Sequence, residues 1–221
     1  MRRLSTLVAA LGTVFAMSSA QALIVVVDDF NTPDLQVIDQ AGGGATVAGD
    51  AVRTLSHELL LGTNTATGNG SVVTIGSQTF PVGALEVANA SGRNSEVKVS
   101  WNLGANLVPL LGSVSFLFQV IQSDGNPTNV NFLFSNGGPA ISLQAFAIPG
   151  NTINQNLAFG LTGAEQILLN GGGTLTMVVN GATGWDMTLD SFGFEIPEPA
   201  SLALVGMALL GAGVASRRRK A

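Results

Sequence analysis

Apolar and polar side chains alternate along several stretches of the chain, and this alternation predicts β-strands. In residues 96–101 two valines and Trp101 occupy every second position, with polar residues between them. Residues 113–121 and 129–134 repeat the pattern, with phenylalanine and valine at the apolar positions. Strict alternation buries one face of a strand and leaves the other in water. We therefore expect three strands here, with Trp101 in the core and 129–134 as the antiparallel neighbour of 113–121.

Glycine, asparagine and proline interrupt the apolar stretches at a spacing of roughly 8–12 residues, which is typical of sandwiches and barrels. On that spacing we expect about ten to twelve short strands in all. They include a hairpin from residues 71–75 to 78–82, and one helical turn is expected at 163–169. The sequence has no internal repeat of fixed period. It thus predicts an all-β fold, an antiparallel β-sandwich that is jelly-roll-like.

The first and last predicted strands, residues 23–30 and 185–196, share an acidic and aromatic signature: Asp28-Asp29-Phe30 in one and Asp190-Ser191-Phe192 in the other. We expect these strands to lie close together, as in jelly rolls whose termini meet. The apolar parity of the last strand changes near Asp190, which predicts a β-bulge or a strand that switches sheets. At the level of fold alone, this arrangement is similar to galactose-binding-like carbohydrate modules.

The chain begins with a segment that has the parts of a secretory signal peptide. Two arginines precede an apolar run over residues 4–17, and small residues follow, with an A-x-A pair at Ala20 and Ala22. We interpret residues 1–22 as a signal helix that signal peptidase removes after Ala22, or alternatively after Ala20. An uncleaved anchor helix is the other interpretation. The longer twin-arginine pattern is absent, which favours general secretion.

Three parts follow one another at the other end of the chain, residues 196–221. They are Pro197-Glu198-Pro199, an uncharged apolar run of 17 residues, and the basic cluster Arg217, Arg218, Arg219 and Lys220. The run, residues 200–216, is at the short end of what crosses a bilayer core of about 30 Å. The basic cluster would stay cytoplasmic by the positive-inside rule, so the main domain would lie outside. We therefore predict a C-terminal transmembrane helix.

These three parts together resemble the PEP-CTERM sorting tail of bacterial proteins that an exosortase handles. The resemblance rests on Pro197-Glu198-Pro199, the run rich in Leu, Gly and Ala, and the terminal basic cluster. It implies recognition of the tail at the inner membrane, removal near the PEP motif, and release to the cell surface or the extracellular matrix. It implies nothing about the fold of the cargo. A plain C-terminal membrane anchor is the alternative interpretation.

Removal of both ends would leave one cargo domain, residues 23–195, with an acidic surface. This region contains three basic and 13 acidic residues, a net charge of −10. Nucleic-acid binding requires a basic face and is therefore disfavoured. An acidic surface suits solubility outside the cell and attracts divalent cations. The chain has no cysteine, which excludes disulfides and thiolate metal sites, and the domain is long enough to form a core without them.

Paired carboxylates are candidates for a binding site. Asp28 and Asp29 end the first strand, and Asp186 and Asp190 lie in the last one, so the four would approach one another if these strands pair. Carboxylates a few ångströms apart suit calcium or glycoside hydrolysis, and the alternative is solvated strand ends. We expect no cofactor other than a possible calcium ion. Trp185, which follows a glycine at the start of the last strand, is a candidate for stacking on a sugar ring.

The residues give little support for catalysis. His57 is the only histidine, and its neighbour Glu58 would point to the opposite face of a strand. No G-x-S-x-G nucleophile motif is present. We interpret His57 as a surface or loop residue and expect no enzymatic activity. Residues 124–128 lack the downstream glutamate of an EF-hand calcium loop and are interpreted as a turn.

Three functions remain for the cargo. The first is a non-enzymatic structural or adhesive component of the cell surface, extracellular matrix or biofilm. The second is a carbohydrate- or calcium-binding module whose partner is an extracellular polysaccharide. The third is a secreted hydrolase, which the scarcity of histidine, cysteine and tyrosine disfavours. We favour the first, exported by way of signal peptidase, a transient inner-membrane intermediate held by the C-terminal helix, and an exosortase.

Overall fold

The computed structural model describes residues 22–197, apart from residues 33, 40–44, 51, 63–69, 78, 80–82 and 111. The predicted signal helix and the predicted transmembrane helix both lie outside the described residues. Within the described part of the chain, no helix is long and apolar enough to cross a membrane.

The described strands form two antiparallel sheets, which confirms the predicted all-β sandwich. In order across sheet 1, the strands are β11 (Ile153–Gly160), β8 (Ser115–Ser123), β13 (Met187–Ile196), β6 (Ala84–Asn89), β5 (Ser71–Gly76) and β2 (Leu35–Val37), and β1 (Leu23–Asp28) also pairs with β13. In order across sheet 2, they are β10 (Ile141–Ile148), β9 (Thr128–Ser135), β12 (Gly173–Gly181), β7 (Asn94–Leu103), β4 (Arg53–Leu61) and β3 (Thr46–Gly49).

The predicted pairing of residues 113–121 with 129–134 is wrong. These residues form β8 and β9, which lie in opposite sheets and face each other across the core. The rings of Phe116 and Phe132 stack with their centroids 4.2 Å apart. Alternation says which side of a strand is buried, but two strands with matching apolar faces can lie side by side or face to face. The turn between them is thus a crossover between the sheets.

The predicted hairpin from 71–75 to 78–82 is also wrong in its second strand. β5 pairs with β6, with Ser71 opposite Asn89 and Ile75 opposite Leu85. Residues 78 and 80–82 lie outside the described residues. Between the two strands, the Thr79 hydroxyl donates to the carbonyl oxygen of Gly76 at 2.7 Å and accepts from the backbone N–H of Ala84. A side-chain-stabilised loop thus replaces the two-residue turn expected at Gly76-Ser77.

The one described helix, α2 (Gly163–Asn170), confirms the helical turn predicted at 163–169. A capping box begins it, because the Thr162 hydroxyl accepts from the backbone N–H of Glu165 and the Glu165 carboxylate accepts from the backbone N–H of Thr162. Burial raises the pKa of Glu165, but hydrogen bonds from Thr162 and Gln144 outweigh it and hold the pKa below its usual value.

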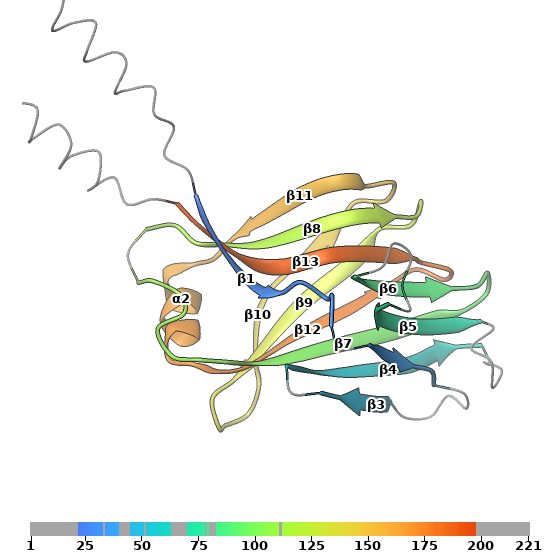
Figure 1. Ribbon diagram of the computed structural model, residues 1–221, viewed down its shortest axis with the longest axis horizontal. Coiled ribbons are helices and arrows are strands. Elements are labelled where there is room, and N and C mark those ends of the chain that lie inside the picture. The colour runs from blue at the N-terminus through green and yellow to red at the C-terminus, as the bar shows by residue number, and fades with distance from the viewer. Residues whose placement is uncertain are drawn as a thin grey trace, which may run out of the picture.

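The first and last strands are paired, as the sequence predicts. β1 runs antiparallel to the last part of β13, with Leu23 opposite Ile196 and Asp28 opposite Phe192. The register of β13 against β8 shifts on both sides of Leu189, which confirms the predicted β-bulge. Figure 1 shows that β1 begins and β13 ends at the same end of the sandwich, which also carries α2.

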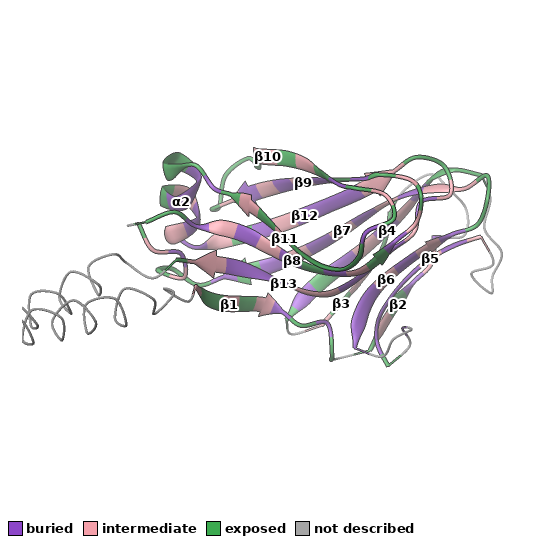
Figure 2. Cartoon of the chain, turned by 90° about the horizontal axis from the view of Figure 1, so that it is seen from above, coloured by how far each residue is buried: buried purple, intermediate pink, exposed green. Residues whose placement is uncertain are grey.

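The core has an aromatic part and a hydrogen-bonded part. Phenylalanine rings from both sheets contact one another in a continuous group: Phe116, Phe118, Phe132, Phe146, Phe159, Phe192 and Phe194. Trp101 is buried, as predicted, and stacks on Phe192 with centroids 4.9 Å apart. In Figure 2 the buried residues follow the strands of both sheets, whereas the start of β1 and the outer side of α2 are exposed.

Candidate functional site

A groove of about 400 Å³ opens on the outer face of sheet 2. Most of its lining comes from two cross-strand rows over β10, β9, β12 and β7, and the core-parity residues Val130 and Phe146 complete it. One row is Ala147, Asn129, Asn180 and Glu96, and the other contains Ala145, Asn131 and Val178. These residues have the parity opposite to the core residues of the same strands, so the alternation that builds the core also places them together.

The groove combines polar groups with an apolar floor. Glu96 Oε1 pairs with Lys98 Nζ at 2.6 Å, and the Asn180 amide lies 3.5 Å from Glu96 Oε2. The Asn131 Oδ1 atom accepts from the Ser142 hydroxyl at 3.1 Å. Amides and a carboxylate can donate to and accept from hydroxyl groups, while alanine and valine can contact the C–H face of a sugar ring. Among the described residues that line the groove there is no tryptophan or tyrosine.

Sequence reasoning missed this groove, although a signal for it was present. Asparagine is disfavoured in strands, yet Asn129 and Asn131 occupy outward positions of the strand predicted at 129–134, and Asn180 occupies an outward position of β12. Asn180 and Asn129 lie next to each other because β12 pairs with β9. Alternation does not predict that pairing.

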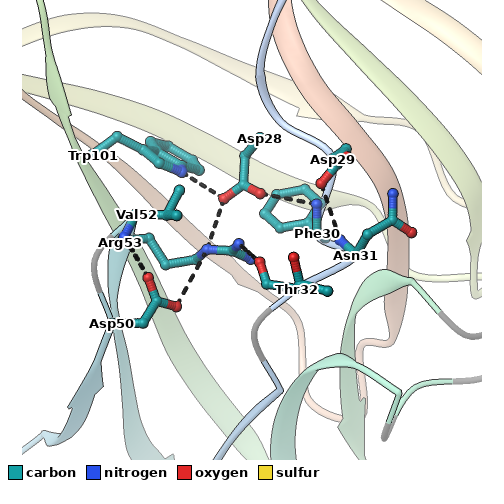
Figure 3. Close-up of polar contacts among 9 residues, drawn as sticks. All are labelled: Asp28, Asp29, Phe30, Asn31, Thr32, Asp50, Val52, Arg53 and Trp101. Atoms are coloured by element: carbon teal, nitrogen blue, oxygen red, sulfur yellow. Dashed lines mark hydrogen bonds and ion pairs between the residues drawn. The ribbon is translucent and has the colours of Figure 1, made fainter.

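The predicted acidic residue Asp28 belongs to a buried ion pair between the two sheets (Figure 3). Its carboxylate accepts from the Trp101 indole N–H at 2.7 Å and from the backbone N–H of Phe30 at 2.9 Å. Arg53 Nε lies 3.0 Å from Asp28 Oδ2, and each of these two side chains is 1% exposed. Burial raises the pKa of Asp28, and the contacts with Trp101, Phe30 and Arg53 oppose that shift.

Arg53 connects this ion pair to two further segments. Its guanidinium lies 5.7 Å from the centre of the Phe30 ring, and its Nη2 atom donates to the carbonyl oxygen of Thr32. The Asp50 carboxylate lies 3.7 Å from Arg53 Nε and accepts from the backbone N–H of Arg53 at 2.9 Å. The carboxylate of Asp28 is thus occupied by protein donors and holds β1 to β4 and β7.

The predicted four-carboxylate site is wrong, although the strands that carry it do pair. Asp28 lies opposite Phe192, which is six residues along the chain from Asp186, a separation of roughly 20 Å in a strand. Asp29 is exposed, and hydrogen bonds with Asn31 hold its pKa below the usual value. Asp190 is half-buried. Among the described residues, no group of three or more His, Asp or Glu side chains could hold a metal ion.

Trp185 and Asp186 directly precede Met187, the first residue of β13, and take part in packing. Burial raises the pKa of Asp186, whose Oδ1 atom accepts from the backbone N–H of Asn89 at 2.5 Å. Trp185 is fully buried, and its indole N–H lies 3.2 Å from both Asn94 Oδ1 and the Ser95 carbonyl oxygen. The interpretation of Trp185 as a sugar-stacking residue is therefore corrected, because no face of its ring reaches the surface.

His57 is also buried, which corrects its interpretation as a surface residue. Its Nδ1 accepts from the backbone N–H of Asp39 at 2.9 Å, so the ring proton is on Nε2, 2.8 Å from the Ser71 hydroxyl. The Ser71 hydroxyl donates to Asn89 Oδ1 at 2.6 Å, and the Ser95 hydroxyl donates to the same oxygen. Because these groups join β4 and β7 of sheet 2 to β5 and β6 of sheet 1 inside the core, they hold the sheets together.

Asp28→Asn is expected to lower the free energy of unfolding by up to about 3–5 kcal/mol, because the buried Arg53 guanidinium keeps only the more distant Asp50 carboxylate as a counter-charge. The measurement is urea unfolding followed by the fluorescence of Trp101 and Trp185, both of which are buried. Asp29→Asn is the matched control, and its exposed side chain should change stability by less than about 0.5 kcal/mol. Equal effects of the two substitutions would contradict the role given to the ion pair.

The stability of the protein is expected to contain a histidine contribution that is lost as the pH falls. Burial lowers the pKa of His57 below its ordinary value of 6.5, so below that pH the unfolded chain binds a proton that the folded protein does not. The contribution then falls by up to about 1.4 kcal/mol per pH unit. The raised pKa values of Asp28 and Asp186 act in the opposite direction. The test is therefore the difference in the free energy of unfolding between wild type and His57→Gln, measured from pH 7 to pH 5. A difference that stays constant over this range would refute the histidine contribution.

Several solved structures are similar to this chain at low sequence identity. The enzymatically active domain of bacteriophage CBA120 tailspike protein 4 is 12% identical, with a TM-score of 0.41, and the match covers 66% of this chain and 19% of that one. The carbohydrate-binding module CtCBM11 is 12% identical, with a TM-score of 0.40, over 83% of this chain and 99% of that one. A family 11 carbohydrate-binding module of a cellulosomal cellulase of Clostridium thermocellum is 10% identical, with a TM-score of 0.38, over 79% of this chain and 95% of that one.

This chain thus spans about a fifth of the length of the tailspike chain that it matches. No curated protein sequence matches the chain.

The end of the described chain leads into the predicted sorting tail. Pro197 is exposed and directly follows Ile196, the last residue of β13, and Ala22 directly precedes β1. Ala20, Glu198, Pro199 and the basic cluster at residues 217–220 lie outside the described residues. The sequence profile of the PEP-CTERM protein-sorting motif matches residues 195–220, which confirms the resemblance. The chain carries a PEP-CTERM protein-sorting motif, which indicates processing by an exosortase and export to the cell surface.

Proposed function

We propose that this protein is a non-enzymatic component of the cell surface or extracellular matrix, released from an inner-membrane intermediate by removal of its tail. The observation that supports the proposal is the sorting motif at residues 195–220, which begins where the folded domain ends. The buried networks support it too, because Asp28, Arg53 and His57 are engaged within the core. A sandwich held by such networks needs no disulfide to persist outside the cell.

The test is the intact mass of the protein recovered from the culture supernatant and from the envelope. We expect a released species that begins near Leu23 and ends near Pro197-Glu198-Pro199, because signal peptidase and an exosortase act on the two ends. Additional mass on that species would indicate glycosylation or attachment to a larger molecule. A full-length chain found solely in the inner membrane would contradict the proposal and leave a simple anchored domain.

A matched pair of variants shows whether the PEP motif directs this processing. Changing both Pro197 and Pro199 to alanine should leave the full-length chain in the membrane, because the extended segment is lost. Pro139→Ala changes an exposed proline in the loop between β9 and β10 and should leave processing unchanged. Loss of processing in the Pro139 variant would mean that altered folding explains both results.

The groove on sheet 2 favours a second function on the same scaffold, the binding of a neutral polysaccharide. Its amides and Glu96 suit hydroxyl groups, and its floor suits the apolar face of a sugar ring. An anionic polymer is disfavoured because the cargo domain carries a net charge of −10. The lining described above contains no tryptophan or tyrosine for stacking, and the ring of Phe146 is stacked on Phe159, so the expected affinity is modest.

Affinity electrophoresis in gels that contain β-glucan, galactan or alginate tests this function. We expect retardation by a neutral polymer and none by alginate. Asn131→Ala and Asn180→Ala should each weaken binding about 10-fold, because each removes a hydrogen-bonding amide worth about 1–1.5 kcal/mol. Asn102→Ala is the control: it lies on the same face of β7, six residues from Glu96, roughly 20 Å along the strand. Equal effects at all three positions, or no retardation by any polymer, would exclude the groove as a polysaccharide site.

A further inference from the structure

We infer that one end of the sandwich is a lipid-facing surface, which rests against the membrane until the tail is removed. This end is formed by the start of β1, the end of β13, α2 and the described residues of 104–114, which are all but residue 111. This inference rests on the proposed inner-membrane intermediate, and it adds the orientation of the domain and the residues that touch the lipid. We call this surface the terminal end. Four observations carry it: the place of the chain ends, the length of chain beyond them, the exposed apolar side chains, and the distribution of charge.

Both chain ends leave the domain at one point. Leu23 is paired with Ile196, so the residues that lead to the two apolar segments begin side by side. Figure 1 shows α2 at the same end of the sandwich, and Figure 2, turned by 90°, shows it there too. Residues 104–114 are joined to α2, because the Asn106 backbone N–H donates to the Asn170 carbonyl oxygen at 2.8 Å and the Asn170 amide donates to the Val108 carbonyl oxygen at 2.6 Å.

The chain between the domain and the apolar tail is too short to hold the domain away from a membrane. Only residues 197–199 separate Ile196 from the apolar run that starts at residue 200. Three extended residues reach at most about 11 Å. The headgroup layer on each side of a bilayer is itself about 5–8 Å thick, from the difference between its total and hydrocarbon thickness. With the tail spanning the membrane, the terminal end must therefore lie at the headgroups.

The terminal end exposes apolar side chains that the core does not use. Leu23 and Ile24 of β1, Leu110 of residues 104–114 and Ile167 of α2 are each more than half exposed. Leu23 and Ile24 are successive residues on opposite faces of a strand, so the start of β1 is largely uncovered on both faces. Interfacial lipid contact buries apolar side chains of this kind.

Charge is distributed so that the terminal end meets little electrostatic opposition from anionic lipids. In described residues 22–26, 104–110, 112–114, 161–172 and 194–197, the charged side chains are Glu165 and Glu195 alone. The Glu165 carboxylate is occupied by hydrogen bonds from Thr162 and Gln144. Asp124 and Asp186 are at the opposite end, where the Asp124 backbone N–H donates to the Asp186 carbonyl oxygen. A domain with a net charge of −10 therefore turns its least acidic end toward the tail.

Single-cysteine labelling of the full-length chain tests this orientation, since the natural sequence has no cysteine. The variants are Ile167→Cys and Leu110→Cys at the terminal end, and Ile153→Cys as the control. Ile153 and Ile167 are equally exposed, at 64% and 65%. Ile153 lies opposite Gln122 of β8, seven residues from Ser115 at the terminal end, or roughly 23 Å along the strand. Each variant is labelled with an environment-sensitive fluorophore and reconstituted into vesicles of phosphatidylethanolamine and phosphatidylglycerol.

The readout is quenching by lipids that carry a nitroxide on the headgroup, compared with quenching by iodide in solution. We expect lipid quenching to be several-fold stronger at positions 110 and 167 than at 153, with the opposite order for iodide. Equal quenching at 153 and 167 in membrane-inserted protein would overturn the orientation but leave the proposed export route intact. A full-length chain that does not insert into the vesicles would overturn the membrane intermediate and the lipid-facing surface together.

Discussion

Phe116 of β8 and Phe132 of β9 stack across the space between the two sheets, and the rest of the molecule depends on that face-to-face contact. Each sheet buries one side of its strands there, so every second residue must be apolar and the residues between are turned outward. The outward rows of sheet 2 carry the asparagine, glutamate, alanine and valine side chains that line the groove. The core and the candidate site are therefore the two faces of the same strands.

Away from the phenylalanine cluster, hydrogen bonds and an ion pair between buried polar groups join the two sheets. The Asp28–Arg53 pair links β1 to β4, and the chain from His57 through Ser71 to Asn89 links β4 to β5 and β6. Such contacts are directional, and a buried donor or acceptor left unpaired costs free energy. They restrict how far one sheet can shift over the other. Apolar packing alone restricts this shift less. In a domain without cysteine, this half of the core fixes the alignment of the sheets.

Much of the fold follows from the local pattern of apolar and polar residues, and the wrong predictions of strand partners and of exposure have one cause. Alternation predicts β7, β8 and β9, and the parity change near Asp190 predicts the bulge. The residues at 163–169 predict α2. Partners were missed because pairing is decided by non-local contacts: β8 and β9 carry matching faces but lie in different sheets. The same limit applies to the sites. Trp185 and His57 were assigned to the surface from neighbouring residues, whereas strands distant in the sequence cover them.

The pairing of Leu23 with Ile196 also determines how the domain responds to mechanical load. A force that pulls the two chain ends apart loads the β1–β13 hydrogen bonds one after another, in the unzipping geometry. A sandwich whose chain ends leave at opposite ends is loaded in shear, so that many hydrogen bonds resist at once. This domain would therefore yield first at β1. Opening would halt at Asp28, where the ion pair with Arg53 anchors the end of that strand to the other sheet.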